Sequence, residues 1–201
     1  MRKLSATMFM SLDGVIQAPG GPGEDGDGDF PYGGWAVTYF DDRMGTVMDE
    51  FLREPVDLVL GRRTYDIFAG YWPQHADEQG VGMPFARATK YVASRGKPDL
   101  SWDKSVLLKG DAARSVAALK KDDGRDLQVH GSVNLLQTLM RAGLVDEYLL
   151  WTFPVLVGTG KRLFTEGVPA GGLELVDTTT STTGVVINRY RPSGDLKTGT
   201  F

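Results

Sequence analysis

The hydrophobic and polar positions of this chain follow two periods in turn, one typical of strands and one typical of helices. Short apolar runs predict strands at residues 1–10, 57–60, 91–93, 105–108, 126–130 and 147–153. Apolar residues three and four positions apart predict one-sided helices at residues 39–53, 111–121 and 133–142, with a further helix after Gly61. Because strands alternate with helices, we expect a mostly parallel sheet joined by right-handed crossovers.

The C-terminal part of the chain has a different pattern. Residues 172–180 and 184–190 are rich in Thr and Val and flank the short polar sequence 181–183, which predicts an antiparallel hairpin at one edge of the sheet. We therefore predict an α/β fold with three layers, in which a mostly parallel central sheet is flanked by helices and ends in a C-terminal antiparallel hairpin. A single domain spans residues 1–192, and a polar tail follows at 193–201.

Residues 17–35 are rich in glycine and aspartate and cannot form part of a core. A structureless segment of this length is typical of a functional lid or a disordered insert. Its acidic run, residues 25–29, departs from a calcium-binding loop because Phe30 stands where that loop needs glycine. The two histidines, His75 and His130, are too far apart in the chain to suggest a metal site by spacing. We expect a solvated lid and no metal site.

A buried-looking strand at residues 57–60 runs into Gly61, Arg62, Arg63 and Thr64 and then into a helix. Glycine permits a sharp turn, and Thr64 stands where a helix N-cap is expected. The start of a helix presents unpaired backbone N–H groups and the positive end of the helix dipole, which favour an anion. Two guanidinium groups beside that point strengthen the prediction of a phosphate site.

A second turn of the same kind follows the strand at residues 126–130. Gly131 makes the turn, Ser132 is the expected N-cap, and the next helix begins at Val133. Two such helix starts on one sheet suit two phosphates of one dinucleotide. The alternative is that strand–glycine–helix turns are common in α/β proteins for geometric reasons, and neither turn carries a Rossmann or Walker glycine pattern.

Composition narrows the classes of protein that fit. A chain of 201 residues with 41% apolar residues can bury one core, and 22 basic against 26 acidic residues argue against general nucleic-acid or membrane-surface binding. With no cysteine, disulfides, thiolate nucleophiles and cysteine-ligated metals are excluded. The first apolar run is too short and too interrupted for a signal peptide, and no segment is long enough for a membrane span. We expect a cytoplasmic protein.

Four motifs in a fixed order carry a family resemblance. They lie at residues 10–16, 60–65, 129–132 and 143–147, the last leading into 154–164. Together they resemble the dihydrofolate reductase-like superfamily, and more narrowly the bacterial reductases related to the C-terminal domain of the bifunctional riboflavin-biosynthesis deaminase-reductase. The likeness extends from about residue 2 to residue 191.

The resemblance implies that NADPH binds across the sheet. It places the Gly-Arg-Arg-Thr turn at the pyrophosphate and the second glycine turn close to the cofactor. The serine hydroxyl and the arginine guanidinium at the end of the third strand would contact the 2′-phosphate, and an isoleucine would face the nicotinamide ring. The residues implied are, in chain order, Ile16, Gly61, Arg62, Arg63, Thr64, Ser94, Arg95, Gly131, Ser132 and Val133.

Relatives also place one carboxylate of the helix after the lid against the substrate ring, where burial would raise its pKa. That helix offers Asp41, Asp42, Asp49 and Glu50, of which we favour Asp42, and Asp13 in the turn after the first strand is a second candidate. The alternative is that the helix carboxylates are solvated charges near a helix start and that Asp13 serves only its turn.

We therefore expect an NADPH-dependent reductase that transfers a hydride to a small pyrimidine- or pteridine-type heteroaromatic substrate, similar to 5-amino-6-(5-phosphoribosylamino)uracil reductase. The alternatives are a non-catalytic nucleotide-binding or regulatory module on the same fold, or a true dihydrofolate reductase. The strand at residues 148–153 and the segment 154–164 carry more apolar surface than one small sheet needs to bury. Because riboflavin-type relatives also commonly dimerise, we expect a homodimer.

Overall fold

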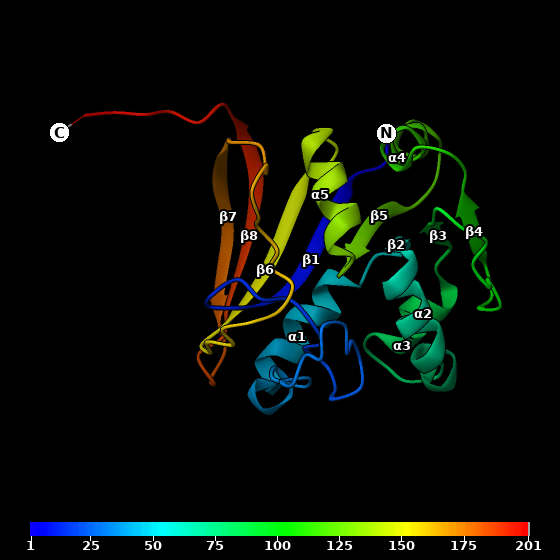
Figure 1. Ribbon diagram of the computed structural model, residues 1–201, viewed down its shortest axis with the longest axis horizontal. Coiled ribbons are helices and arrows are strands. Elements are labelled where there is room, and N and C mark those ends of the chain that lie inside the picture. Colours follow the sequence, from blue (N-terminus) through cyan, green and yellow to red (C-terminus); the bar gives the residue numbers. More distant parts are fainter. Residues whose placement is uncertain (201) are drawn as a thin grey trace.

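The computed structural model describes residues 1–200 and is built on one eight-stranded sheet (Figure 1). Across the sheet the strands follow the order β4-β3-β2-β5-β1-β6-β8-β7. Their bounds in chain order are β1 Leu4–Ser11, β2 Val56–Gly61, β3 Lys90–Ala93, β4 Ser105–Leu108, β5 Asp126–His130, β6 Glu147–Phe153, β7 Gly172–Thr180 and β8 Val186–Gly194.

The sheet is parallel from β4 to β6, and β8 then runs antiparallel to β6, with β7 antiparallel to β8. The predicted mostly parallel sheet with a C-terminal hairpin at its edge is thus confirmed. The hairpin is longer than its sequence pattern suggested, because pairing continues until Gly172 lies opposite Gly194. Strand β8 therefore extends two residues into the predicted polar tail, to residue 194.

Five α-helices accompany the sheet, namely α1 Asp42–Phe51, α2 Arg62–Tyr71, α3 Gly82–Arg87, α4 Ala112–Lys121 and α5 Val133–Arg141. Two short 3₁₀ helices, η1 Val37–Tyr39 and η2 Trp72–His75, precede α1 and follow α2. The first helix begins later than predicted because Asp41 caps it, its carboxylate accepting a hydrogen bond from the backbone N–H of Met44 at 2.8 Å. The short α3 went unpredicted because six residues carry too little of the helical period.

The helices cover both faces of the sheet, which confirms the three-layer arrangement. On β1, Ala6 and Met8 belong to the core that contains the apolar residues of α4 and α5. Phe9, on the opposite face of β1, packs with the residues of α1, while α2 and α3 cover the neighbouring strands β2 and β3 on that same face. This alternation follows from the two-residue period of a strand.

A buried ion pair joins the start of the chain to the middle of the sheet. The Arg2 guanidinium contacts the Asp57 carboxylate at 2.5 Å, and both side chains are almost fully buried. The second oxygen of Asp57 accepts the backbone N–H of Thr89 at 2.9 Å, while Arg2 also donates to the carbonyl of Arg125. The pair therefore links segments of the chain that lie next to β1, β2, β3 and β5.

Among the helices of residues 1–200, none combines the length and the apolar character that crossing a membrane requires.

Candidate functional site

A cavity of about 1420 Å³ opens at the carboxyl ends of the parallel strands. Its walls come from the segments that follow β1, β2, β3, β4 and β5, which is the edge where open α/β sheets bind ligands. All ten residues that the resemblance assigned to the cofactor line this cavity, namely Ile16, Gly61, Arg62, Arg63, Thr64, Ser94, Arg95, Gly131, Ser132 and Val133.

The first glycine turn places the start of α2 at the cavity wall. Gly61 has an extended backbone and is itself the N-cap, so the helix begins at Arg62, and the prediction that Thr64 is the N-cap is wrong. No side chain caps this helix, so its first-turn N–H groups are available to a ligand. The correction moves Thr64 inside the first turn, with its side chain toward the second glycine turn.

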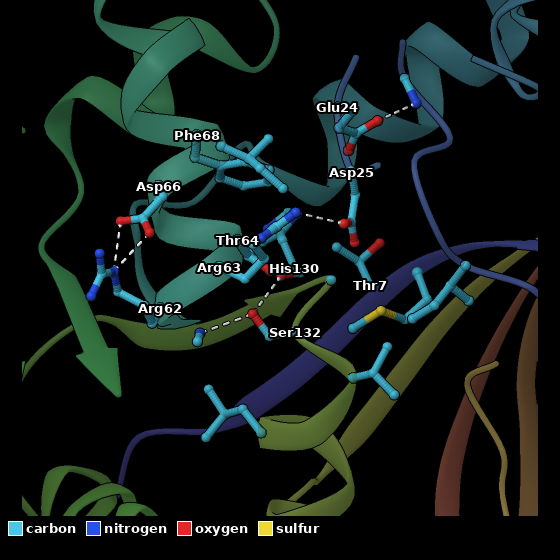
Figure 2. Close-up of a pocket in the computed structure, with 18 of the residues that line it drawn as sticks. Thr7, Glu24, Asp25, Arg62, Arg63, Thr64, Asp66, Phe68, His130 and Ser132 are labelled. Carbon is cyan, nitrogen blue, oxygen red and sulfur yellow. Dashed lines mark hydrogen bonds and ion pairs between the residues drawn. The ribbon is translucent and has the colours of Figure 1, made fainter. Parts of the chain in front are cut away.

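The second glycine turn is joined directly to the first. Ser132 is the N-cap residue of α5 as predicted, but its hydroxyl accepts the backbone N–H of Gly61 at 2.9 Å instead of capping its own helix (Figure 2). Gly131 and Ser132 both have left-handed backbones, and a Cβ on Gly131 would stand 3.4 Å from the Thr64 side chain. This close approach brings the two uncapped helix starts side by side.

A third polar point lies at the end of β3, where Ser94 and Arg95 face the same cavity. The Arg95 side chain is exposed and has no ion pair within residues 1–200. Ser94 accepts the backbone N–H of Gly96 at 3.1 Å, which fixes the turn. Asp111, at the end of the following strand, lines this region too and caps α4 by accepting the N–H of Arg114.

The loop of residues 17–35 is tied to the cavity by ion pairs. Asp25 and Asp27 both contact Arg63, at 3.1 and 2.6 Å, and both contact Lys161 at 2.7 Å. Figure 2 shows Arg63 directed toward Asp25. The hydrogen bond from Lys161 lowers the pKa of Asp27. The expected solvated run is thus wrong for Asp25, which is buried because cations far away in sequence hold it. The expectation that residues 17–35 stay out of the core is also wrong, since Ala18 and Phe30 pack in a small buried cluster.

Acidic side chains outnumber basic ones in the cavity lining. The basic residues are Arg62, Arg63, Arg95 and Lys161, and the acidic ones are Glu24, Asp25, Asp27, Asp49, Asp66 and Asp111. Arg62 pairs with Asp66 at 2.7 Å, one helical turn along α2. Both partners of that pair are about half exposed, so the pair contributes only about 0.3–0.5 kcal/mol.

A cluster of aromatic rings forms the other end of the cavity, which we call the aromatic half. Phe68 stacks on Phe85 with ring centroids 5.7 Å apart, and Trp72 meets Phe85 edge to face at 5.2 Å. His130 lies against Phe85 at 4.9 Å. Phe68 lies six residues beyond Arg62 along α2, or about 9 Å, and Trp72 follows the end of that helix, whereas His130 directly precedes the second glycine turn. We call the end of the cavity at the two glycine turns the phosphate half.

The hydrogen bonds of His130 determine its tautomer. The Gln128 amide nitrogen donates to the carbonyl of Phe51, which leaves the amide oxygen to accept from His130 Nε2 at 3.0 Å. Nε2 therefore carries the proton, and Nδ1 has a free lone pair without a hydrogen-bond partner in residues 1–200. Burial lowers the pKa of His130 to about 3, so the ring is neutral near pH 7.

We expect the stability of the protein to fall as the pH drops from about 6.5 towards 3. The pKa of His130 is about 3 in the folded protein against 6.5 ordinarily, so between these values the unfolded chain binds one proton more than the folded chain. This contributes a slope of about 1.4 kcal/mol per pH unit. Urea unfolding between pH 4 and 7 should show a shallower slope for His130→Gln than for His75→Gln, the control. Equal slopes would contradict the assignment.

The two predicted catalytic carboxylates lie outside the cavity lining. Asp42 is exposed in the first turn of α1, and Asp49, two turns further along, is the α1 carboxylate that faces the cavity. Asp13 accepts hydrogen bonds from the Ser11 hydroxyl and from the backbone N–H groups of Val157 and Gly158, which hold its pKa well below the usual range. These hydrogen bonds tie the turn after β1 to the segment that follows β6.

Glu24 is a cavity residue that sequence reasoning missed. Its carboxylate accepts the backbone N–H of Gly20 at 2.6 Å, and partial burial raises its pKa. It stands in a glycine-rich loop with no periodic pattern, so no signal in the sequence pointed to it. Within residues 1–200 no group of three or more His, Cys, Asp or Glu side chains is arranged to hold a metal ion.

The chain is similar to known sequences over almost its whole length. The family model for the RibD C-terminal domain matches residues 2–187. The protein YyaP of Bacillus subtilis (strain 168), which is uncharacterized, is 29% identical over 196 residues, with 96% of each chain covered.

Two solved structures share the fold. A candidate riboflavin biosynthesis protein from Shewanella sp. PV-4 superposes with a TM-score of 0.67 at 22% identity, covering 95% of this chain and 99% of that one. Dihydrofolate reductase from Enterococcus faecalis, solved in complex with NADP(H) and RAB-propyl, superposes with a TM-score of 0.59 at 16% identity, covering 95% of this chain and 96% of that one. The dihydrofolate reductase-like fold predicted from the sequence is therefore confirmed.

Proposed function

Since this chain belongs to the RibD C-terminal domain family, we propose that it is an NADPH-dependent reductase that transfers a hydride to a small pyrimidine- or pteridine-type ring. The family and the dihydrofolate reductase-like fold support a reductase-type function. The cofactor and the class of substrate are our proposal, which the cavity described above supports.

The observation that carries the proposal is the hydrogen bond between the Ser132 hydroxyl and the Gly61 N–H. It joins two helix starts, neither of which has a side-chain cap, and so sets two groups of free N–H donors beside each other. With Arg95 at the next strand end, the phosphate half offers separate donors for a pyrophosphate and for a third phosphate. A phosphorylated dinucleotide fits this set better than a single phosphate does.

The protein's part in the reaction is to hold two rings together and keep water away. When bound, NADPH would supply the hydride. Ile16, which is almost fully buried at the cavity wall beside β1, would give the nicotinamide an apolar contact. Glu24 is the cavity carboxyl whose burial raises its pKa, so it is the group best suited to hold a proton for the reduced ring.

Titration with NADPH tests the cofactor directly. We expect binding to change the protein fluorescence, since Trp72 lines the cavity, and we expect the double variant Arg62→Ala, Arg63→Ala to weaken it about 10–100-fold through lost charged hydrogen bonds. Arg114→Ala, on α4 and outside the cavity lining, is the control and should bind normally. No binding by the unmodified protein, or no effect of the double variant, would show that the cofactor assignment is wrong.

Turnover separates a reductase from a binding module on the same fold. Steady oxidation of NADPH with a reducible pterin or pyrimidine would exclude a purely regulatory role, whereas tight binding without turnover would support one. In the same assay Glu24→Gln should lower the rate and flatten the acidic part of the pH profile, because an amide cannot supply the proton. An unchanged profile would remove Glu24 from the mechanism.

A further inference from the structure

We propose that the substrate of this cavity is an uncharged or cationic nitrogen heterocycle, and that its N–H groups donate hydrogen bonds to Asp49 and His130. The substrate carries neither a phosphate nor a carboxylate tail. This proposal rests on the reductase function proposed above, and it names the chemical class of ring that the aromatic half selects. It separates this protein from enzymes that act on phosphorylated pyrimidines and from those that act on folates with an acidic tail.

The aromatic half is built to stack a flat ring. Phe68 and Trp72 are only partly buried and line the cavity, while Phe85, which packs against both, is fully buried. Met48, from the facing helix α1, supplies a further apolar contact. Aromatic side chains in this arrangement favour a planar heteroaromatic ligand.

The polar groups of the aromatic half accept hydrogen bonds and do not neutralise anions. Asp49 is an exposed residue of the cavity lining and forms no hydrogen bond or ion pair within residues 1–200. His130 presents the free lone pair of Nδ1, because its Nε2 proton is given to Gln128. A neutral histidine cannot balance a phosphate, whereas a ring with N–H donors satisfies both residues.

Three of the four basic side chains of the cavity lining already form ion pairs, and the fourth is Arg95 at the end of β3. Arg63 and Lys161 are shared between two loop carboxylates, and Arg62 and Arg95 lie in the phosphate half, where the dinucleotide needs them. The wall of the aromatic half formed by α1, the end of α2 and residues 79–85 contributes no Lys or Arg. An anionic group of a ligand in the aromatic half would lie near the unpaired Asp49 carboxylate with no cation to compensate. The repulsion between the two negative charges would weaken binding of the ligand.

Three arginines lie near this wall but face a different cavity. Arg53, Arg87 and Arg125 line a smaller cavity of about 410 Å³, whose lining shares only Gln79 and Gly80 with the main one. A long acidic tail would have to pass these two residues to reach them. The test below therefore includes a ligand with such a tail.

Paired ligands that differ only in charge test the proposal. The pairs are a dihydropterin with and without its aminobenzoyl-glutamate tail, and a diaminouracil riboside with and without its 5′-phosphate, titrated calorimetrically into the protein with and without NADP⁺. We expect the uncharged member of at least one pair to bind about tenfold or more tightly than its anionic partner. Equal or tighter binding of the anionic members, or no binding by any ligand, overturns the proposal.

Charge reversal at Asp49 supplies an independent test. Asp49→Arg is expected to reverse the preference within a pair, because it puts a cation where the substrate ring sits, and Asp49→Asn should weaken the uncharged member about tenfold. Glu50→Arg makes the same change of charge on the neighbouring exposed position outside the cavity and should leave the preference unchanged. If Glu50→Arg also reverses the preference between the two ligands of a pair, the preference would come from the overall charge of the protein and not from Asp49, and the proposal would be overturned.

The binding measurements test the substrate class independently of the proposed reductase function. The ligand pairs are compared by binding alone, so the ratio within a pair does not require NADPH or turnover. Absence of NADPH binding would remove the reductase proposal, whereas a preference for the anionic ligand by a protein that oxidises NADPH would remove only the substrate class.

Discussion

Replacing Arg95 by alanine is expected to weaken NADPH binding about 10–100-fold while leaving NADH binding unchanged. Arg95 is the one basic side chain of the cavity lining that forms no ion pair within residues 1–200. It stands beside the Ser94 hydroxyl at the end of β3, one strand away from the glycine turn that we assign to the pyrophosphate. The 2′-phosphate is the only group in which the two cofactors differ, so the loss should be confined to NADPH.

The comparison is made by fluorescence titration of both cofactors with the unmodified protein and the variant. Lys97→Ala removes a cation two residues further along the same exposed turn, outside the cavity lining, and is the matched control. An equal loss for NADPH and NADH would mean that Arg95 acts on another part of the dinucleotide. If the unmodified protein prefers NADH, the 2′-hydroxyl of the adenosine ribose would instead donate a hydrogen bond to Asp111, which lines the same end of the cavity.

Asp57→Ala is expected to lower the free energy of unfolding by about 3–5 kcal/mol. The substitution leaves the Arg2 guanidinium buried without its counter-charge and removes the acceptor of the Thr89 N–H. Stability of small proteins is commonly only 5–15 kcal/mol, so this single change would remove a large part of it. Urea unfolding at neutral pH, followed by fluorescence and circular dichroism, measures the effect.

Two further variants keep this prediction testable if Asp57→Ala does not fold. The double variant Arg2→Met, Asp57→Leu removes both charges and should recover most of the lost stability, since the burial of an unpaired charge causes the loss. Glu50→Gln breaks the exposed pair with Arg53, whose atoms are 3.9 Å apart, and should change stability by less than about 1 kcal/mol. If Asp57→Ala and Glu50→Gln lowered the free energy of unfolding by similar amounts, the burial of an unpaired Arg2 charge would not be the cause of the loss.

Local patterns in the sequence were enough to place most of the phosphate half. A strand that is apolar on both faces, followed by glycine and a helical period, places Gly61 and Arg62 at the carboxyl end of the sheet whatever surrounds them. The same reasoning located Gly131 and Ser132, and all these residues line one cavity. What the local pattern could not show is that the Ser132 hydroxyl leaves its own helix and binds Gly61.

The substrate side was harder because its residues meet only in three dimensions. Asp42 and Asp49 lie on one helix at positions that the sequence treats alike, and the packing of α1 against the sheet turns Asp49 towards the cavity. Asp25 reads as a solvated loop residue until the fold brings Arg63 and Lys161 to it across 38 and 136 positions of chain. Such pairings depend on which strands become neighbours.

Periodicity and backbone sterics within short segments account for the order of strands and helices, the parallel sheet with its terminal hairpin, and the two glycine turns that bring helix starts to one edge of the sheet. Three features of the site became visible only in the folded chain: which charges are neutralised, which carboxylate of α1 faces the cavity, and which His130 nitrogen stays free. Those features depend on burial and on contacts between distant segments, which no local pattern encodes.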